Sequence, residues 1–271
     1  EYISLLDIQK VKNGLGESRL KRLVIGKAGV ANSFLTAISG IENAYALQEI
    51  DITGLRLVTS LDLSQQTELR RLSARQSGLR DVSLPEGAPV SVLELPAAVQ
   101  VLRLKDYPLL SSSGLMLEDG GSSVHSISII NCPNLSNDIN LPIRWLASKE
   151  AEDSRCALYI DNIAWTNVDP ALFLKICAAK ENGMSVTLKG KVMLSKSSQQ
   201  TIDDITRALG REVFSPNNEF YVYAPDAVYL SGPSTVIEGD TAQFVATVFS
   251  EHMGDVRFGL LNNSRAGVSI D

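Results

Sequence analysis

The side chains that most often carry catalysis are few and scattered in this sequence. Its two histidines, His125 and His252, lie near no nucleophile motif and show no metal-ligand spacing, and no G-x-S-x-G, H-E-x-x-H, Walker or G-x-G-x-x-G phrase occurs. Because catalysis needs several groups that converge on one point, we expect both histidines to be ordinary surface or loop residues. The sequence therefore predicts no catalytic residue and no enzyme.

Several acidic and amide residues lie close together in the sequence and are candidates for proton transfer or calcium binding. Asp203 and Asp204 are adjacent, so on a helix their side chains diverge by about 100° and do not share a site. Asp161 with Asn162, and the stretch 137–140, lack the alternating oxygen ligands of a calcium loop. Turn formation is the preferred interpretation for both. We expect neither a metal nor a cofactor.

The three cysteines, Cys132, Cys156 and Cys177, lie far apart in the sequence, and three cannot all pair. No C-x-x-C motif suggests zinc. Cys132 and Cys177 occupy apolar slots, and a buried thiol behaves as a small hydrophobic group. We therefore expect core thiols at these two positions and no disulfide framework.

Composition favours a folded chain without an electrostatic partner. Of the 271 residues, 44% are hydrophobic and 21% are charged, which suits a globular protein. The formal net charge of -6 gives no reason to expect binding to nucleic acid or to an anionic membrane. No apolar run approaches the roughly 20 residues of a membrane helix, so no membrane span is expected in this segment.

The strands that would position a binding site are indicated by a short repeated motif of apolar residues, the phrase L-x-x-L-x-[LA]. Val58-x-x-Leu61-x-Leu63 and Leu69-x-x-Leu72-x-Ala74 are two examples. Equivalent positions fall at 50, 61, 72, 82, 93 and 102, in steps of 11, 11, 10, 11 and 9 residues. These steps are too short for a helix plus a strand. We expect two extended segments in each coil of about 22 residues, one on each broad side.

Other segments show the signals of a cap or a helix. Residues 5–8 predict an opening strand or cap, and the apolar face of 33–39 predicts a short helix. Asp169, followed by a proline and an apolar face, predicts a helix that ends at Gly183. Residues 198–209, followed by a glycine, predict another helix.

Two stretches resemble a known repeat family. Leu61-Asp62-Leu63-Ser64-Gln65-Gln66-Thr67-Glu68-Leu69-Arg70-Arg71-Leu72-Ser73-Ala74 resembles the compact leucine-rich repeats of surface and prophage-encoded proteins of gut anaerobes. Ile127-Ser128-Ile129-Ile130-Asn131-Cys132-Pro133-Asn134-Leu135 is similar to the general leucine-rich repeat, with Cys132 at the ladder position. The resemblance covers about residues 20–195, and Leu55, Gln66, Ser77 and Tyr107 depart from its asparagine ladder. It implies an α/β leucine-rich-repeat solenoid, a right-handed β/α superhelix, over residues 1–223.

The character of the sequence changes after a short hinge at Ala224-Pro225-Asp226. Val228-x-Leu230-x-Gly232-Pro233 and Gly239-Asp240-Thr241-Ala242-Gln243-Phe244 resemble the opening strands of bacterial Ig-like (group 2) domains. The resemblance covers residues 225–271, where a full seven-strand sandwich needs roughly 100 residues. It implies an incomplete Ig-like β-sandwich module.

A partner would contact the outward positions of the strands. We expect one parallel sheet built around Ile50, Leu72, Leu102, Ile127, Leu158 and Val186. Its solvent face would carry Glu49, Asp51, Arg71, Ser73, Arg75, Arg103, Lys105, Ser126, Ser128, Tyr159, Asp161, Thr187 and Lys189. Of these, the predicted partner-binding residues are Arg71, Ser73, Arg75, Arg103, Lys105, Ser126, Ser128, Tyr159 and Asp161. Their four basic side chains would form a cluster, or else Glu49 and Arg71 would belong to a ladder of cross-strand charge pairs.

Both resemblances imply binding or display outside the cytoplasm, on a cell surface or in a phage particle. The leading hypothesis is a non-enzymatic protein whose sheet face binds a protein or a surface glycan. One alternative is a structural protein of a phage tail or head that binds nothing specific. Another is a glycan-acting hydrolase, which needs two carboxylates about 5–10 Å apart in a groove. An aromatic content of 6%, with only Trp145 and Trp165 as tryptophans, offers little for that.

Overall fold

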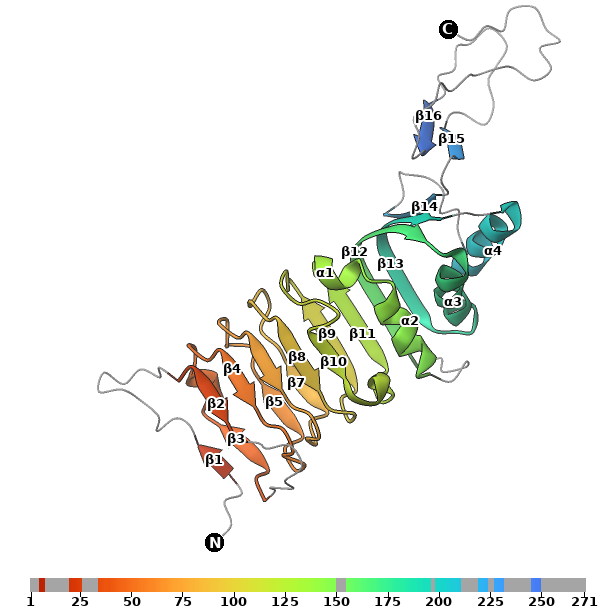
Figure 1. Cartoon of the computed structure of the whole chain (residues 1–271). Helices are drawn as coiled ribbons and strands as arrows, with labels where there is room; N and C mark the ends of the chain where they lie inside the picture. Colours follow the sequence, from red (N-terminus) through yellow and green to blue (C-terminus); the bar gives the residue numbers. More distant parts are fainter. Residues whose placement is uncertain are drawn as a thin grey trace, which may run out of the picture. The chain divides into compact units, whose positions relative to one another are not determined.

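The structure is a computed structural model, drawn in Figure 1, and it describes residues 5–7, 20–25, 34–149, 155–195, 198–210, 219–223, 227–231 and 245–249. The chain divides into two compact units, Glu1–Tyr223 and Ala224–Asp271. Each unit is described by itself. The assignment of these units to a repeat domain and an Ig-like domain stays a prediction.

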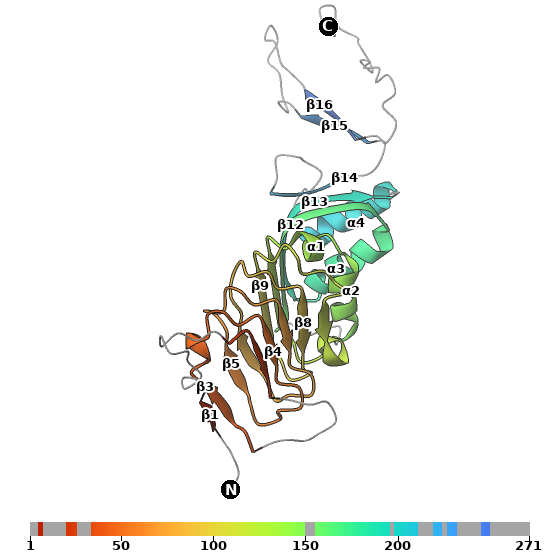
Figure 2. The same ribbon diagram turned by 60° about the vertical axis from the view of Figure 1, so that its left-hand side comes forward.

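In the first unit, the strands between residues 49 and 130 alternate between two rows of parallel strands, and the later strands all lie in one of these rows (Figure 2). The first sheet contains β2 (Arg22–Val24), β4 (Glu49–Asp51), β6 (Arg71–Ser73), β8 (Val92–Leu95) and β10 (Leu115–Leu117). The second sheet contains β9 (Val101–Lys105), β11 (Ser126–Ile130), β12 (Ala157–Val168), β13 (Ser185–Leu194) and β14 (Phe220–Tyr223). A separate parallel pair consists of β5 (Ser60–Asp62) and β7 (Asp81–Ser83).

The repeated apolar phrase explains this arrangement, because its central residues turn inward and stack in register. In the first sheet Ile50 lies beside Leu72, and Leu72 lies beside Leu93. In the second sheet Leu102 lies beside Ile127, and both are 1% exposed or less. Backbone hydrogen bonds also join neighbouring strands beyond their ends, as from the Ile52 amide to the Ser73 carbonyl at 2.8 Å. Each buried side chain of this kind contributes roughly 1.5–3 kcal/mol relative to an exposed one.

The expectation of one sheet through all six stacking residues is wrong. Ile50 and Leu72 lie in the first sheet, whereas Leu102, Ile127, Leu158 and Val186 lie in the second. The reason is that successive repeats of the apolar motif alternate between the two rows of strands. From Leu72 the phrase passes through Val82 and Leu93 before it reaches Leu102, which is three steps. An odd number of steps places Leu102 on the opposite side.

Helices take the place of strands on one side of the later coils. They are α1 (Pro133–Ser136), α2 (Asn140–Ala147), α3 (Pro170–Glu181) and α4 (Gln199–Leu209), and α2, α3 and α4 follow one another beside the second sheet (Figure 1). The helices α3 and α4 are those predicted from their caps. Phe173 of α3 packs between two rings of the second sheet, with centroid distances of 6.3 Å to Trp165 and 6.2 Å to Phe220.

The first part of the chain contains a strand where a helix was expected. Of the segment 33–39, residues 34–39 are described, and Ala37–Ser39 forms strand β3. It pairs in parallel with β1 (Leu5–Asp7), the opening strand expected within 5–8. The helix prediction is wrong because its apolar face does not share one environment. Leu35 is buried, whereas Phe34 is 56% exposed. Two short 3-10 turns, η1 (Ile41–Asn43) and η2 (Glu118–Gly121), complete the described elements of this unit.

In the second unit, the described residues form one antiparallel pair, β15 (Ala227–Ser231) and β16 (Val245–Phe249), with Val228 opposite Val248. The Ig-like sandwich stays a prediction, since most of the segments that support it lie outside the described residues. None of the described helices has the length and apolarity that crossing a bilayer requires.

Candidate binding face

The nine predicted partner-binding residues lie on two different sheets. Arg71, Ser73 and Arg75 belong to β6 and the turn that follows it, in the first sheet. The others lie on β9, β11 and β12 of the second sheet: Arg103, Lys105, Ser126, Ser128, Tyr159 and Asp161. The predicted basic cluster is therefore wrong, because Arg71 and Arg75 are separated from Arg103 and Lys105 by the core between the sheets.

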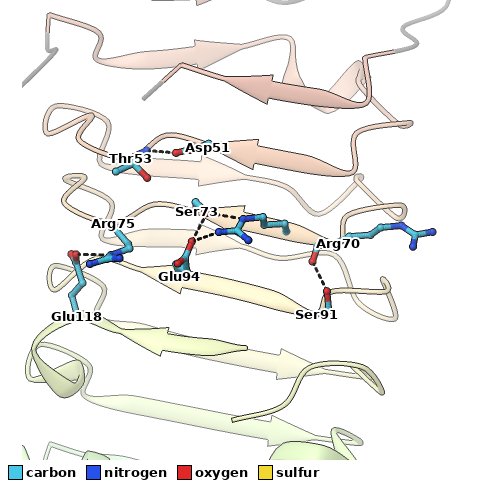
Figure 3. Close-up of polar contacts among 9 residues, drawn as sticks. Asp51, Thr53, Arg70, Ser73, Arg75, Ser91, Glu94 and Glu118 are labelled. Atoms are coloured by element: carbon cyan, nitrogen blue, oxygen red, sulfur yellow. Dashed lines mark hydrogen bonds and ion pairs between the residues drawn. The ribbon is translucent and has the colours of Figure 1, made fainter. Parts of the chain in front are cut away.

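On the first sheet, the basic side chains are neutralised by carboxylates of neighbouring coils (Figure 3). Arg71 lies 2.9 Å from Glu94, and the Ser73 hydroxyl donates to the same carboxylate. Arg75 lies 3.5 Å from Glu118. Glu49 does lie beside Arg71 in register, but its ion-pair partner is Arg22 of β2 on its other side, at 3.0 Å. The ladder of cross-strand pairs thus describes this sheet better than a free basic surface.

The outward side of the second sheet is a row of polar side chains, which we call the β9–β13 face. Parallel register places Arg103 beside Ser128, and Ser128 beside Tyr159. Tyr159 in turn lies beside Thr187 of β13. Strand alternation sets this row outward, because the flanking residues on each strand turn into the core. The row contains three hydroxyl groups next to one guanidinium group.

Charged residues surround the Tyr159 end of this face. The Tyr159 hydroxyl donates to the Asp161 carboxylate at 3.3 Å. Lys189 of β13 lies 3.6 Å from Glu219, and the charge of Glu219, followed by the neighbouring Tyr159, raises the pKa of Lys189. The lysine therefore stays protonated across the physiological range, and Asp161 and Lys189 present opposite charges on either side of the phenol.

At the other end of the face, the two basic residues of β9 differ in their pairing. Lys105 lies 2.7 Å from Glu86, and this hydrogen-bonded ion pair raises the pKa of Lys105. Arg103 is exposed, and no carboxylate of the described part of the chain forms an ion pair with it. Arg103 is thus the predicted cation that retains its full hydrogen-bonding capacity for a ligand.

A line of left-handed residues bounds the face, and sequence reasoning missed it. Asp106, Asn131, Asn162 and Gly190 have positive φ angles of 61°, 52°, 63° and 123°, and each directly follows the last outward residue of the face on its strand. The Asn131 amide donates to the Asp106 carboxylate of the previous coil at 2.9 Å. Asparagine, aspartate and glycine tolerate this conformation best. Their recurrence two residues past the last apolar residue of the repeated motif was the available signal.

The remaining candidates for chemistry do not come together. His125 is exposed in the loop before β11, and His252 lies outside the described residues. Asp204 forms an ion pair with Arg207 at 3.0 Å on the surface of α4. The Asp138 side chain accepts a hydrogen bond from the Asn140 amide at 2.9 Å, as a turn residue does. The Asn137 side chain instead accepts one from the Ala164 amide of β12 at 2.7 Å. Within the described residues, no group of acidic, histidine and cysteine side chains has the arrangement of a metal site.

All three cysteines are buried. Burial raises the pKa of the Cys132 thiol, and it raises the pKa of Cys177 to about 12. A thiol held in its protonated form is a poor nucleophile and a poor metal ligand. Cys132 and Cys177 therefore act as small apolar groups of the core, as the sequence suggested.

Comparisons of the chain with models of protein families, with curated proteins and with solved structures find no match.

Proposed function

We propose that the chain is a non-enzymatic binding protein that presents the β9–β13 face to a protein or surface glycan outside the cytoplasm. In this proposal, residues 1–223 form a leucine-rich-repeat solenoid, and residues 225–271 begin an Ig-like module. The face then serves as a rigid, flat surface held by the stacked core. The partner carries hydroxyl or amide groups together with a carboxylate, which acidic proteins and acidic glycans both provide.

The contrast between the two sheets carries the proposal. On the first sheet, Arg22, Arg71 and Arg75 each form an ion pair with a glutamate of the same chain, so their charges are already paired. On the second sheet, Arg103 keeps a free fork of N–H donors beside the Ser128 hydroxyl, and the Tyr159 hydroxyl follows one strand further along the face. A guanidinium group binds a carboxylate through two parallel hydrogen bonds, which gives both affinity and orientation.

The chemistry of the face favours recognition over hydrolysis. Glycoside hydrolysis needs two carboxylates about 5–10 Å apart on either side of a bound sugar in a groove. The carboxylate of Asp161 already accepts hydrogen bonds from Tyr159 and from the backbone of Asn162. A hollow lined by residues of β10 and α2 has no carboxylate in its lining. Neither place offers the pair of acids that a hydrolase would use.

The test compares charge reversal at two exposed arginines. The full chain is labelled and applied to a glycan array and to a peptide-display library, alone and as the variants Arg103→Glu and Arg70→Glu. Arg70 lies just before β6 and, like Arg103, has no ion pair among the described residues. We expect Arg103→Glu to weaken binding to the selected ligands by about tenfold or more, and Arg70→Glu to leave it unchanged.

Three outcomes contradict the proposal. Ligands whose binding survives both Arg103→Glu and Tyr159→Ala place the binding surface elsewhere on the chain. An absence of any ligand in both screens favours the purely structural alternative. Release of shortened glycans from the array makes the protein a hydrolase.

A further inference from the structure

The β9–β13 face continues beyond β9, onto the strands β7 and β5 of the earlier coils. The Gln100 amide, directly before β9, donates to the Arg80 carbonyl at 3.2 Å, just as the Arg80 amide donates to the Thr59 carbonyl beside β5 at 2.8 Å. These equivalent bonds place β5, β7 and β9 side by side in the same register. One outward residue of each strand then lies in a single line, which we call the polar row: Asp62, Ser83, Arg103, Ser128, Tyr159 and Thr187.

The polar row is long, and its hydroxyl groups are open to a ligand. It crosses six strands at about 4.8 Å per step and therefore spans about 24 Å. In the described part of the chain, the hydroxyl groups of Ser83, Ser128 and Thr187 have no hydrogen-bond partner, and all three residues are exposed or half-buried. The hydroxyl of Ser73 on the first sheet, by contrast, donates to a glutamate. A linear ligand with many hydroxyl groups would find a partner at successive strands of the row.

The composition of the row favours a glycan over a protein as this ligand. Protein interfaces depend on aromatic and apolar anchors, and serine, aspartate and lysine are depleted in them. The exposed large apolar side chains of the described residues all lie outside the strands of the row: Val24, Phe34, Tyr45, Leu57, Leu109 and Met116. A sugar chain does not need such anchors, because it presents hydroxyl groups along its whole length.

Tyr159 is the aromatic residue of the row. Its ring offers an apolar surface against which the C–H face of a sugar can pack. The Tyr159 hydroxyl donates to the Asp161 carboxylate at 3.3 Å, which restricts the orientation of the ring. Arg103 lies two strands away, about 9.6 Å along the row. A ligand that contacts both side chains therefore extends along the row.

The charges along the row limit how many acidic groups this ligand carries. Asp62, and Asp81 on the neighbouring strand β7, are exposed, and neither forms an ion pair within the described residues. Both repel a negative charge at the β5 end of the row, whereas Arg103 attracts one near its middle. Lys189 at the other end is already paired with Glu219. The row thus matches one carboxylate on a mainly neutral chain.

We propose that the β9–β13 face, extended along the polar row, binds a linear glycan in which a single carboxylate group lies among neutral sugars. This inference rests on the function proposed above and specifies its ligand. The carboxylate pairs with Arg103, a neutral ring packs on Tyr159, and hydroxyl groups of the chain form hydrogen bonds with Ser83, Ser128 and Thr187.

Matched glycans separate the contribution of the charge from that of the sugar chain. The full chain is applied to an array on which each acidic glycan stands beside the same glycan with its carboxyl group reduced to the alcohol. We expect glycans with one carboxylate to bind about tenfold or more tightly than their reduced partners. Arg103→Gln should remove this preference, and Arg70→Gln, outside the row, should keep it. Tyr159→Ala should weaken both forms, whereas Tyr159→Phe, which keeps the ring, should not.

The double variant Asp62→Asn with Asp81→Asn tests the limit on charge. Oligomers of galacturonic acid carry a carboxylate on every unit, and the variant should bind them roughly threefold more tightly than the unmodified chain does. Glycans with one carboxylate should respond less, because their charge lies at Arg103. Both aspartates are exposed, so the substitutions are not expected to unfold the chain.

Equal binding of the acidic and the reduced glycans overturns this inference. So does tighter binding of galacturonic acid oligomers than of singly charged glycans by the unmodified chain. If only displayed peptides bind, and Arg103→Gln weakens them, the partner is a protein, and the inference fails while the proposed function stands. If no ligand of either class depends on Arg103, both fail.

Discussion

Single residues end or bend four strands of the second sheet: Asp106 and Asn131 directly follow β9 and β11, whereas Asn162 and Gly190 lie within β12 and β13, at their register shift. Asp106, Asn131, Asn162 and Gly190 adopt left-handed backbone conformations at equivalent places in successive coils. The first three are polar residues that tolerate this conformation and whose side chains can hydrogen-bond nearby groups. Gly190 is different, because its φ of 123° lies in a region that only glycine adopts readily.

Gly190→Ala should be strongly destabilising. A Cβ atom there would lie 2.3 Å from the Ile163 carbonyl oxygen and 2.5 Å from the Ile163 nitrogen, both backbone atoms that cannot move aside easily. We expect the free energy of unfolding in urea to fall by about 3 kcal/mol or more, from the clash and the backbone strain together. The matched control is Gly87→Ala, which has a φ of 71° and no atom within 4 Å of its Cβ. It should cost only about 1–2 kcal/mol. Equal losses for the two variants would contradict the close approach at Gly190.

Cys177 should respond to pH as a buried thiol does. Its pKa is raised from the usual 9.0 to about 12, first of all by burial. Because the unfolded chain loses this proton near pH 9 and the folded chain keeps it, the contribution to stability is complete below pH 9 and is lost as the pH rises toward 12. At pH 9 we expect iodoacetamide to label Cys177 quickly in urea and slowly in the folded chain, as measured by mass spectrometry of the peptides. Fast labelling of the folded chain would contradict burial of the thiol.

At the scale of elements, local signals predicted the helices better than the sheets. Asp169 and Ser198 accept bonds from the first turns of α3 and α4, and such caps are readable in the sequence. The helix α2 was not predicted: the stretch 137–140 that leads into it was interpreted as a turn, although Leu141 and Trp145 are spaced i, i+4. Sheet membership is not a local property. It depends on counting half-coils along the chain, and an error of one half-coil moves every later strand to the other side.

Substitutions at the N-cap of α3 test whether such a local sequence signal contributes to stability. The Asp169 carboxylate accepts a hydrogen bond from the Ala171 amide at 2.8 Å. Asp169→Ala should lower the free energy of unfolding by about 1 kcal/mol, because that amide loses its partner. Asp169→Ser should restore most of the loss, since serine also caps well. Urea titrations of the three proteins provide the measurement. An equal loss for alanine and serine would mean that α3 depends on packing of Phe173 and Ile176 and not on its cap.

At the scale of the first unit, stability depends on neighbouring coils that share one interior. The few large apolar side chains that one repeat buries do not offset the conformational entropy that its residues lose on ordering. One coil is therefore unstable alone. Stacking places an apolar neighbour on both sides of residues such as Ile127, which lies between Leu102 and Leu158 in the second sheet. A destabilising substitution at one interior position should therefore also destabilise the neighbouring strands.

Leu102→Asp and Arg103→Asp place the same side chain on opposite sides of β9. Leu102 is fully buried between the sheets, so an aspartate there loses the apolar contacts and must bury a charge, which costs several kcal/mol. Arg103 points outward, and its replacement should change the free energy of unfolding by no more than about 0.5 kcal/mol. In hydrogen exchange, we expect Leu102→Asp to remove amide protection from β11 and β12 as well as from β9, and Arg103→Asp to leave all three protected. Loss of protection confined to β9 would mean that the coils fold independently, and a rigid face spanning β9 to β13 would then have no common core to hold it flat.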